Sequence, residues 1–219
     1  MSVIQDAVDQ TVATENYGWK AAAPDSASYL NAPVRALVAE VRPRDVLDAG
    51  CGNGALAAEL AADGYQVVGI DADAHGLDHA RHRAPGVKFV QAVFECDPAS
   101  LGATSDGRVD VVISTEVIEH LYAPHELVRF AFNALRPGGR FIVTTPYHGY
   151  LKNLVLSLFN GWDRHFSVDW YGGHIKFWSR QSLSTVLEKH GFRVIGFRGV
   201  GRMPFLWKSM ILIAERPAA

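Results

Sequence analysis

The sequence has little cysteine and no long apolar segment, and both absences narrow the class of protein. Cys51 and Cys96 are the two cysteines among 219 residues, too few for a disulfide scaffold and not spaced as a metal site. No run of about 18 apolar residues occurs, and the N-terminus lacks the basic start and apolar core of a signal peptide. The formal net charge is −2, which does not favour nucleic acid as a partner. We therefore expect a cytoplasmic globular protein.

The chain length suits one domain with a full hydrophobic core, so we expect a single domain over residues 1–219. From Asp45 onwards, short apolar segments alternate with amphipathic ones. Strands are predicted at residues 45–50, 66–71, 87–92, 109–114, 140–145, 192–197 and 208–215, and helices at 53–64, 72–84, 125–135 and 179–191. This alternation predicts a doubly wound α/β fold, in which helices cover both faces of a mostly parallel sheet.

Four parts of this domain are expected to differ in role. They are an N-terminal arm over 1–40, a cofactor-binding core over 41–146, an insertion or lid over 147–178, and a C-terminal helix and strands over 179–219. The arm carries the aromatic residues Tyr17, Trp19 and Tyr29. We expect it to contain a helix and to fold over a site.

A glycine-rich loop after the first strand predicts a nucleotide-binding site. In LDAGCGNGA, Gly50, Gly52 and Gly54 stand between a strand and a helix. Glycine there permits a tight turn and close approach of a ligand, while free amides at the helix start favour an anionic group. Asp71 ends the second strand, where a carboxylate can accept hydrogen bonds from both hydroxyls of a ribose. The loop and the acid together predict an adenosine-type nucleotide.

The identity of that nucleotide depends on Asp48. The glycines also fit the pattern of dinucleotide-binding proteins, so a nicotinamide cofactor stays open. Asp48 ends an otherwise apolar strand, and a buried carboxylate needs hydrogen-bond donors. It could hold the glycine loop or meet a cationic ligand. An ammonium and a sulfonium would suit it better than a pyrophosphate would.

Four blocks of sequence together resemble the class I S-adenosylmethionine-dependent methyltransferases. The blocks are VLDAGCGNG, VVGID, VDVVISTEVIEHL and LRPGGRFIVTTP. The resemblance implies a Rossmann-like sheet of seven strands whose last strand, KSMILIAE, is antiparallel. It also implies a set of cofactor-binding residues: Asp48, Gly50, Cys51, Gly52 and Gly54 around the methionine part, Asp71 and Ala72 at the ribose, Ala92, Val93 and Phe94 beside the adenine, and Thr115 nearby. Many members carry an acid after the third strand, where this chain has none before Glu95.

Two carboxylates and an imidazole, Glu116, Glu119 and His120, follow the fourth strand at the edge where ligands bind. A solvated helix start would also explain the glutamates. Together with GGHIKFWSRQSL, this block resembles two groups of enzymes. They are the ubiquinone-pathway O-methyltransferases, which act on catechol-like rings, and the 2′-O-methyltransferases of small-RNA 3′ ends.

In the RNA group, two glutamates and two histidines hold a divalent metal. The resemblance implies that Glu116, Glu119, His120 and His174 would do so in this chain. Two carboxylates and two imidazoles would accept manganese, iron, cobalt or zinc more readily than magnesium. Glu119 and His120 would then also take part in catalysis.

His148 follows the fifth strand and is a candidate general base, although a plain loop histidine fits equally well. The segment 146–178 holds nine of the 23 aromatic residues. Within it, one helix face is apolar: Leu151, Leu154, Val155, Leu158 and Phe159. The segment could be a packing subdomain, a membrane-surface contact, or a lid over an apolar acceptor pocket, which we prefer.

These observations predict methylation of a small, partly apolar acceptor on a hydroxyl of catechol or vicinal-diol type, with assistance from a metal. Three alternatives stay open. They are an RNA 2′-O-methyltransferase, a nicotinamide-dependent oxidoreductase, and a protein that binds S-adenosylmethionine without catalysis. The sequence identifies neither the acceptor nor the oligomeric state.

Overall fold

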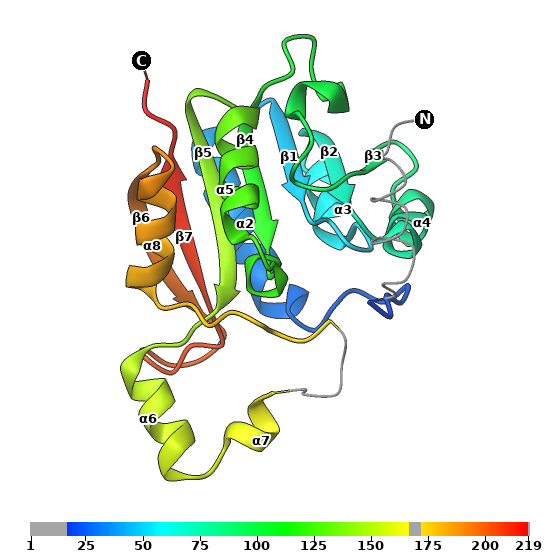
Figure 1. The fold of residues 1–219 in the computed structure, drawn as a ribbon. Coiled ribbons are helices and arrows are strands. Elements are labelled where there is room, and N and C mark those ends of the chain that lie inside the picture. The colour runs from blue at the N-terminus through cyan, green and yellow to red at the C-terminus, as the bar shows by residue number, and fades with distance from the viewer. Residues whose placement is uncertain (1–16, 167–171, 219) are drawn as a thin grey trace.

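A seven-stranded sheet forms the centre of the molecule (Figure 1). The computed structural model describes residues 17–166 and 172–218. The strands, in chain order, are β1 Asp45–Ala49, β2 Gln66–Asp71, β3 Lys88–Gln91, β4 Val109–Thr115, β5 Leu135–Pro146, β6 Arg193–Val200 and β7 Ser209–Glu215. Their order in the sheet is β3-β2-β1-β4-β5-β7-β6, and β7 is antiparallel to both of its neighbours. The predicted mostly parallel sheet with an antiparallel last strand is confirmed.

Helices cover both faces of this sheet. They are α2 Ala27–Val41, α3 Ala55–Ala62, α4 Ala74–Arg83, α5 Pro124–Ala134, α6 Tyr150–Leu158, α7 Trp162–His165 and α8 Arg180–Lys189, with short 3-10 turns η1 Pro98–Leu101 and η2 Ile118–His120. Successive side chains of a strand point to opposite faces. Leu47 of β1 therefore belongs to the core under α5 and α8, while Val46 belongs to the core under α2, α3 and α4.

The fifth strand begins earlier than the sequence predicted. The run Pro137–Gly139 was expected to end the preceding helix, and strand structure was expected from Arg140. Instead β5 starts at Leu135, and its pairing with β4 shifts register around these residues. Gly138 accommodates the irregularity with a φ of 80°, and its amide donates to the Arg216 carbonyl. The glycines therefore bulge the strand rather than end it.

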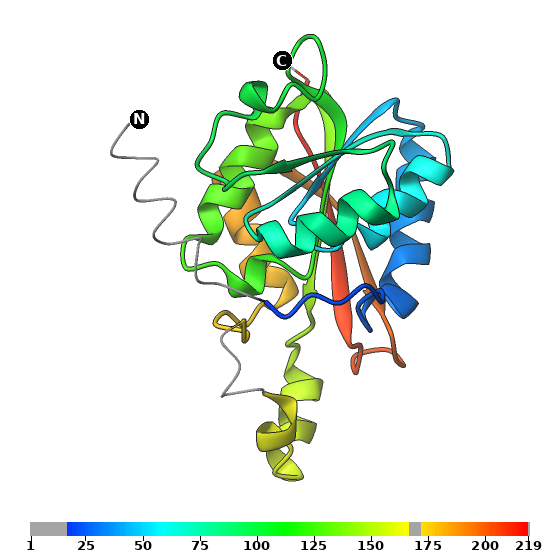
Figure 2. The same cartoon turned by 90° about the vertical axis from the view of Figure 1, so that its right-hand side faces the viewer.

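The N-terminal arm is described from Tyr17. Residues 17–26 are irregular, and the helix α2 begins at Ala27. The prediction for residues 1–16 lies outside the described part of the chain. The segment from Tyr17 crosses the sheet edge near the start of α4 (Figure 2).

The insertion hangs from the carboxyl edge of the sheet as α6 and α7 (Figures 1 and 2). Its two ends are joined, because Tyr147 pairs with Trp178 and the His148 amide donates to the Trp178 carbonyl over 3.1 Å. Residues 167–171 of the insertion lie outside the described part. No helix in the described residues is long and apolar enough to cross a membrane.

Helix α6 is amphipathic, but unlike a core helix it buries a charged residue and exposes apolar ones. Several of its apolar residues are exposed to solvent, among them Leu154 at 38% and Leu158 at 71%, while Val155 and Leu156 are half-buried. Its buried residue is Lys152, which is only 7% exposed. The apolar stripe predicted from the sequence is present, but α6 projects beyond the sheet, so no described element covers the stripe.

Candidate active site

The glycine loop adopts backbone conformations that require glycine. Gly50, Gly52 and Gly54 have φ angles of 82°, 51° and 71°. A Cβ atom on Gly50 would lie 2.4 Å from the Val117 side chain, and one on Gly52 would lie 2.3 Å from the Trp19 ring. Both the backbone conformation and the close packing of neighbouring side chains therefore require glycine at these positions.

Asp71 fastens this loop to the end of β2. One carboxylate oxygen accepts from the Gly52 amide over 2.8 Å, and the other accepts from the Asp73 amide over 2.9 Å. Burial raises the pKa of Asp71, although both amide hydrogen bonds oppose the rise. Each carboxylate oxygen can accept more than one hydrogen bond. The predicted contact with a ribose is thus compatible with the structural role, and it stays a prediction.

Asp48 lies at the bottom of a cavity beside the glycine loop. Its side chain is 1% exposed, and Oδ1 has no hydrogen-bond partner among the described residues. Burial, followed by the charge of Asp71, raises the pKa of Asp48 to about 7. The cavity is lined by Trp19, Pro24, Ser26, Ala27, Leu30, Asn31, Asp48, Gly50, Cys51, Asn53, Ala55, Leu56, Thr115 and Glu116. An orphaned carboxylate oxygen in such a place fits a ligand that carries an ammonium group.

The predicted cofactor residues divide into two groups. Asp48, Gly50, Cys51 and Thr115 line the cavity. The segment after β3 lies farther along the same sheet edge, where the Ala92 amide donates to the Asp71 carbonyl over 3.0 Å. In addition, the side-chain amide of Gln91 donates to the Ala72 carbonyl over 3.0 Å. Val93 and Phe94 follow in that segment, half-buried. Backbone contacts therefore bring residues 91–94 next to the end of β2.

The described part of the N-terminal arm crosses the glycine loop. Trp19 packs directly on Gly52 and lines the cavity. The Asn53 side-chain amide donates to the carbonyls of Lys20 and Ala22, both over 2.8 Å. Arg83 in turn donates to the carbonyl and side-chain oxygens of Asn53. We call residues 17–22 the strap.

Sequence reasoning expected an arm over a site, but it identified neither Asn53 nor Arg83. The asparagine inside the glycine run was the available signal, because Asn53 is 2% exposed and a polar side chain is buried only with partners.

We expect Asn53→Ala to weaken binding of S-adenosylhomocysteine about tenfold, because two buried hydrogen bonds to the strap are lost. Calorimetric titration checks this, with His75→Ala on the exposed start of α4 as the control. Equal affinity in wild type and Asn53→Ala would mean that the strap does not contribute to the cofactor site.

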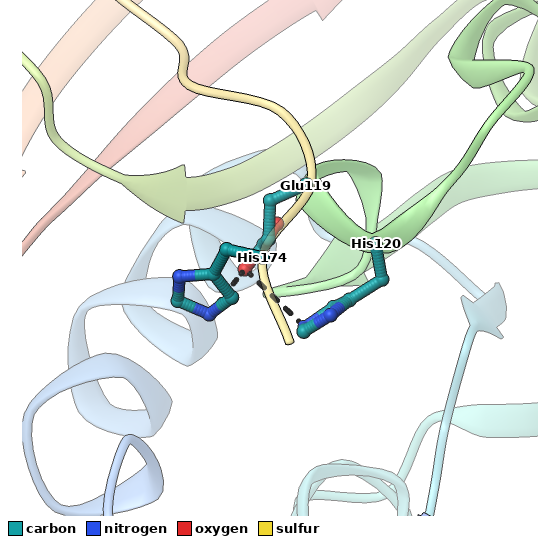
Figure 3. Close-up of side chains that lie close together, drawn as sticks. All are labelled: Glu119, His120 and His174. Atoms are coloured by element: carbon teal, nitrogen blue, oxygen red, sulfur yellow. Dashed lines mark ion pairs between the residues drawn. The ribbon is translucent and has the colours of Figure 1, made fainter. Parts of the chain in front are cut away.

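Three side chains of types that can bind metal ions converge at the end of β4 (Figure 3). Glu119 Oε1 lies 3.9 Å from His120 Nε2 and 4.0 Å from His174 Nε2. Glu119 is fully buried, and neither of its carboxylate oxygens has a hydrogen-bond partner in the described residues. A buried carboxylate without donors beside two imidazole nitrogens fits a site for a divalent cation.

Backbone hydrogen bonds bring His174 to this place from the insertion. The Glu119 carbonyl accepts from the amides of Ile175 and Lys176, each over 3.0 Å. His120 Nδ1 lies 3.2 Å from the Gly173 carbonyl. The turn η2 and the end of the insertion are thus bonded to one another, so their side chains share one side of the sheet edge.

The electrostatics of the cluster favour neutral imidazoles. Burial, and then the neighbouring His120, lowers the pKa of His174 to about 4. Burial also lowers the pKa of His120. Burial and the charge of Glu116 raise the pKa of Glu119 well above its usual range. Neutral imidazoles are the form that binds metal ions, and a cation would remove the cost of an ionised Glu119.

Glu116 does not belong to this group of three. Its carboxylate accepts from the Thr144 hydroxyl over 2.8 Å and from the Ser209 hydroxyl over 2.9 Å. It has a φ of 53°, which is uncommon for a residue with a side chain and directs the carboxylate towards β5 and β7. Burial raises its pKa to about 7. The structure thus brings together three of the four predicted metal ligands, and Glu116 lines the cofactor cavity instead.

His148 is buried at the start of the insertion. It is 7% exposed, and its Nε2 has no hydrogen-bond partner in the described residues. Burial, followed by the charge of Lys152, lowers the pKa of His148 to about 4. The imidazole is therefore neutral near pH 7, but a pKa this low also makes it a weaker base than an ordinary histidine.

The order of the strands, the glycine loop and the cavity at the carboxyl edge define a methyltransferase-type α/β fold. The methyltransferase domain family matches residues 26–196. The chain therefore belongs to that family, whose members use S-adenosylmethionine. This membership decides against a nicotinamide-dependent oxidoreductase.

Relatives agree with this assignment. The chain is 42% identical over 104 residues to a probable S-adenosylmethionine-dependent methyltransferase of Mycolicibacterium smegmatis, covering 47% of this chain and 38% of the relative. It is 29% identical to a ubiquinone biosynthesis O-methyltransferase of a Methylobacterium species, covering 80% of this chain and 73% of the relative. A solved magnesium protoporphyrin IX methyltransferase from Synechocystis with bound S-adenosylhomocysteine shares the fold, with a TM-score of 0.64, 19% identity, and coverage of 98% and 95%.

Proposed function

We propose that this protein transfers the methyl group of S-adenosylmethionine to a hydroxyl of a small acceptor that carries two adjacent hydroxyls. We further propose that Glu119, His120 and His174 hold a divalent cation beside that acceptor. The observation that carries the proposal is the position of the three side chains. They lie at the carboxyl edge, where Glu119 follows Glu116, a residue that lines the cofactor cavity, by three positions.

The residues of the chain have separate roles in this scheme. Asp48 would orient the ammonium group of the cofactor, and the glycine loop would hold its methionine part. A divalent cation, when bound, makes an attached hydroxyl more acidic. His148 would accept the released proton through its unpaired Nε2. Because its pKa is low, it would need a hydroxyl that the cation has already made more acidic. The insertion would exclude water from the acceptor.

The similarity to a ubiquinone biosynthesis O-methyltransferase supports oxygen as the methylated atom, because that relative is covered over 73% of its length. The chemistry of the cluster gives separate support. A single in-line displacement needs an activated nucleophile more than a covalent intermediate. A hydroxyl gains in particular from a nearby cation, which makes it more acidic, and from a base, which takes its proton.

Labelled-methyl transfer to a panel of acceptors tests the proposal. The panel contains catechols, vicinal diols, polyprenyl phenols, sugars and RNA ends, each supplied with a divalent cation. We expect transfer to compounds with adjacent hydroxyls, and little transfer to their monohydroxyl analogues. Transfer to RNA ends alone would show that the acceptor is RNA and not a small molecule. Equal transfer to diols and monohydroxyl compounds would contradict the proposed role of the cluster.

A further inference from the structure

Lys152 is a buried amine on a helix that is otherwise exposed. It is 7% exposed, whereas Leu151 and Leu154 beside it are 43% and 38% exposed. Lysine is almost never buried without a partner, because removing an ammonium from water is costly. The orientation of α6 therefore places a cation inward, at the carboxyl edge of the sheet, and leaves apolar side chains in water.

The protein itself supplies little compensation for this charge. Among the residues that the structure describes, the one hydrogen bond of Lys152 Nζ runs to the Lys208 carbonyl over 3.4 Å, which is long. No carboxylate oxygen of the described residues lies within 4.0 Å of Nζ. Glu116 is near enough to attract the ammonium, but its oxygens accept from Thr144 and Ser209. The guanidinium of Arg202 lies near enough to repel it.

A second buried polar group faces the same region. His148 precedes α6, is 7% exposed, and has no partner for Nε2 in the described residues. Its ring lies 5.4 Å from the His165 ring and 5.0 Å from the Phe177 ring, between centroids. Phe177 is 54% exposed. His148 is near enough to Lys152 to feel its charge, and the His148 ring stands beside an aromatic side chain that is open on one side.

We propose that Lys152 binds an anionic oxygen group of the methyl acceptor, a carboxylate or a phosphate, while the apolar body of the acceptor lies against Phe177. This inference rests on the proposed function, because it assigns the second recognition group of the same acceptor. An anionic oxygen would give the buried ammonium a charged partner, which the described residues do not supply. Acceptors without such a group would leave Lys152 uncompensated.

Binding to the protein saturated with S-adenosylhomocysteine tests the proposal without turnover. The ligands form two matched pairs, protocatechuate with its neutral amide and glycerol phosphate with glycerol. Calorimetry of the wild type should show at least about tenfold tighter binding of one anion than of its neutral partner, as a charge-assisted hydrogen bond implies. The pair that shows the preference identifies carboxylate or phosphate as the group.

Variants assign the preference to Lys152. Lys152→Met should remove it while the neutral ligand binds within about twofold of wild type, and Lys152→Arg should keep it. Lys189→Met, exposed on α8, is the control and should keep it fully. If Lys152→Met no longer binds S-adenosylhomocysteine and has therefore lost its fold, Lys152→Gln, which keeps a polar side chain without the charge, should still remove the preference.

Two outcomes would overturn the proposal: no preference for either anion in the wild type, or an unchanged preference in Lys152→Met. Failure of the proposed function looks different. In that case no hydroxyl compound accepts a methyl group, while the Lys152-dependent binding of the anion is still measured.

Discussion

Asp48→Asn should nearly abolish cofactor binding and yet make the free protein more stable. The orphaned oxygen of Asp48 is the acceptor that fits the ammonium of the cofactor. An amide there would lose the charge and turn a donor toward the ligand. We expect the affinity for S-adenosylhomocysteine to fall about 100-fold or more, as for a charged group that loses its buried partner. Asp78→Asn, exposed on α4, is the control and should bind normally.

The gain in stability should depend on pH. The pKa of Asp48 rises from 3.8 to about 7 on folding, so the folded protein binds more protons than the unfolded chain between these values. Stability therefore falls as pH rises through this range, and the full penalty, about 4 kcal/mol, applies above it. Asparagine avoids the charge but still buries an unpaired polar group, which itself costs about 1–3 kcal/mol. We therefore expect about 2 kcal/mol of added stability near pH 8 and little gain near pH 3.5, in denaturant titrations.

Equal stability of the two proteins near pH 8 would show that Asp48 is ionised and compensated in the free protein. Normal affinity of Asp48→Asn for S-adenosylhomocysteine would show that Asp48 does not contact the cofactor. The two results are independent, so each part of the prediction can fail by itself.

Chelation should abolish methyl transfer, and an added transition metal should restore it. Glu119, His120 and His174 offer one carboxylate and two neutral imidazoles to one ion. His174→Ala removes one of three ligands and should lower activity about 100-fold or more. His75→Ala, on the exposed start of α4, should have no effect. Activity is measured after treatment with EDTA and again after addition of manganese, cobalt or zinc.

Cobalt provides a readout that does not depend on turnover. Co²⁺ bound by two imidazoles and a carboxylate should give visible absorption bands, which His174→Ala and Glu119→Gln should lose. Full activity in EDTA, or an unchanged cobalt spectrum in His174→Ala, would show that the cluster is structural. His148 would then activate the acceptor without a cation.

The sequence predicted those parts of the fold that local patterns of apolar residues and glycines determine. Between Asp45 and Thr145, the apolar runs specify the strands, and Gly50 and Gly52 specify the loop by conformations that other residues avoid. The position of His174 near Glu119 came from resemblance, because the backbone hydrogen bonds that join them link residues far apart in sequence.

Other features depended on contacts that no local pattern reports. Glu116 turns towards Thr144 and Ser209, which come from two other strands, so its separation from the metal ligands was not predicted. The periodicity of α6 predicted an apolar face but could not show that this face lies outside. Lys152, the charged residue in a mostly apolar helix, was the signal available for the inward side.

Because the two ends of the insertion are held together, its length and sequence can change during evolution. Tyr147 pairs with Trp178, so the chain leaves the sheet and returns to it at one point. The cost of closing a loop rises by only about 0.6 kcal/mol when its length doubles. The stretch between these two residues can therefore be lengthened, shortened or exchanged while the sheet and the glycine loop keep their structure. A single framework could in this way acquire new acceptors by replacing one tethered segment.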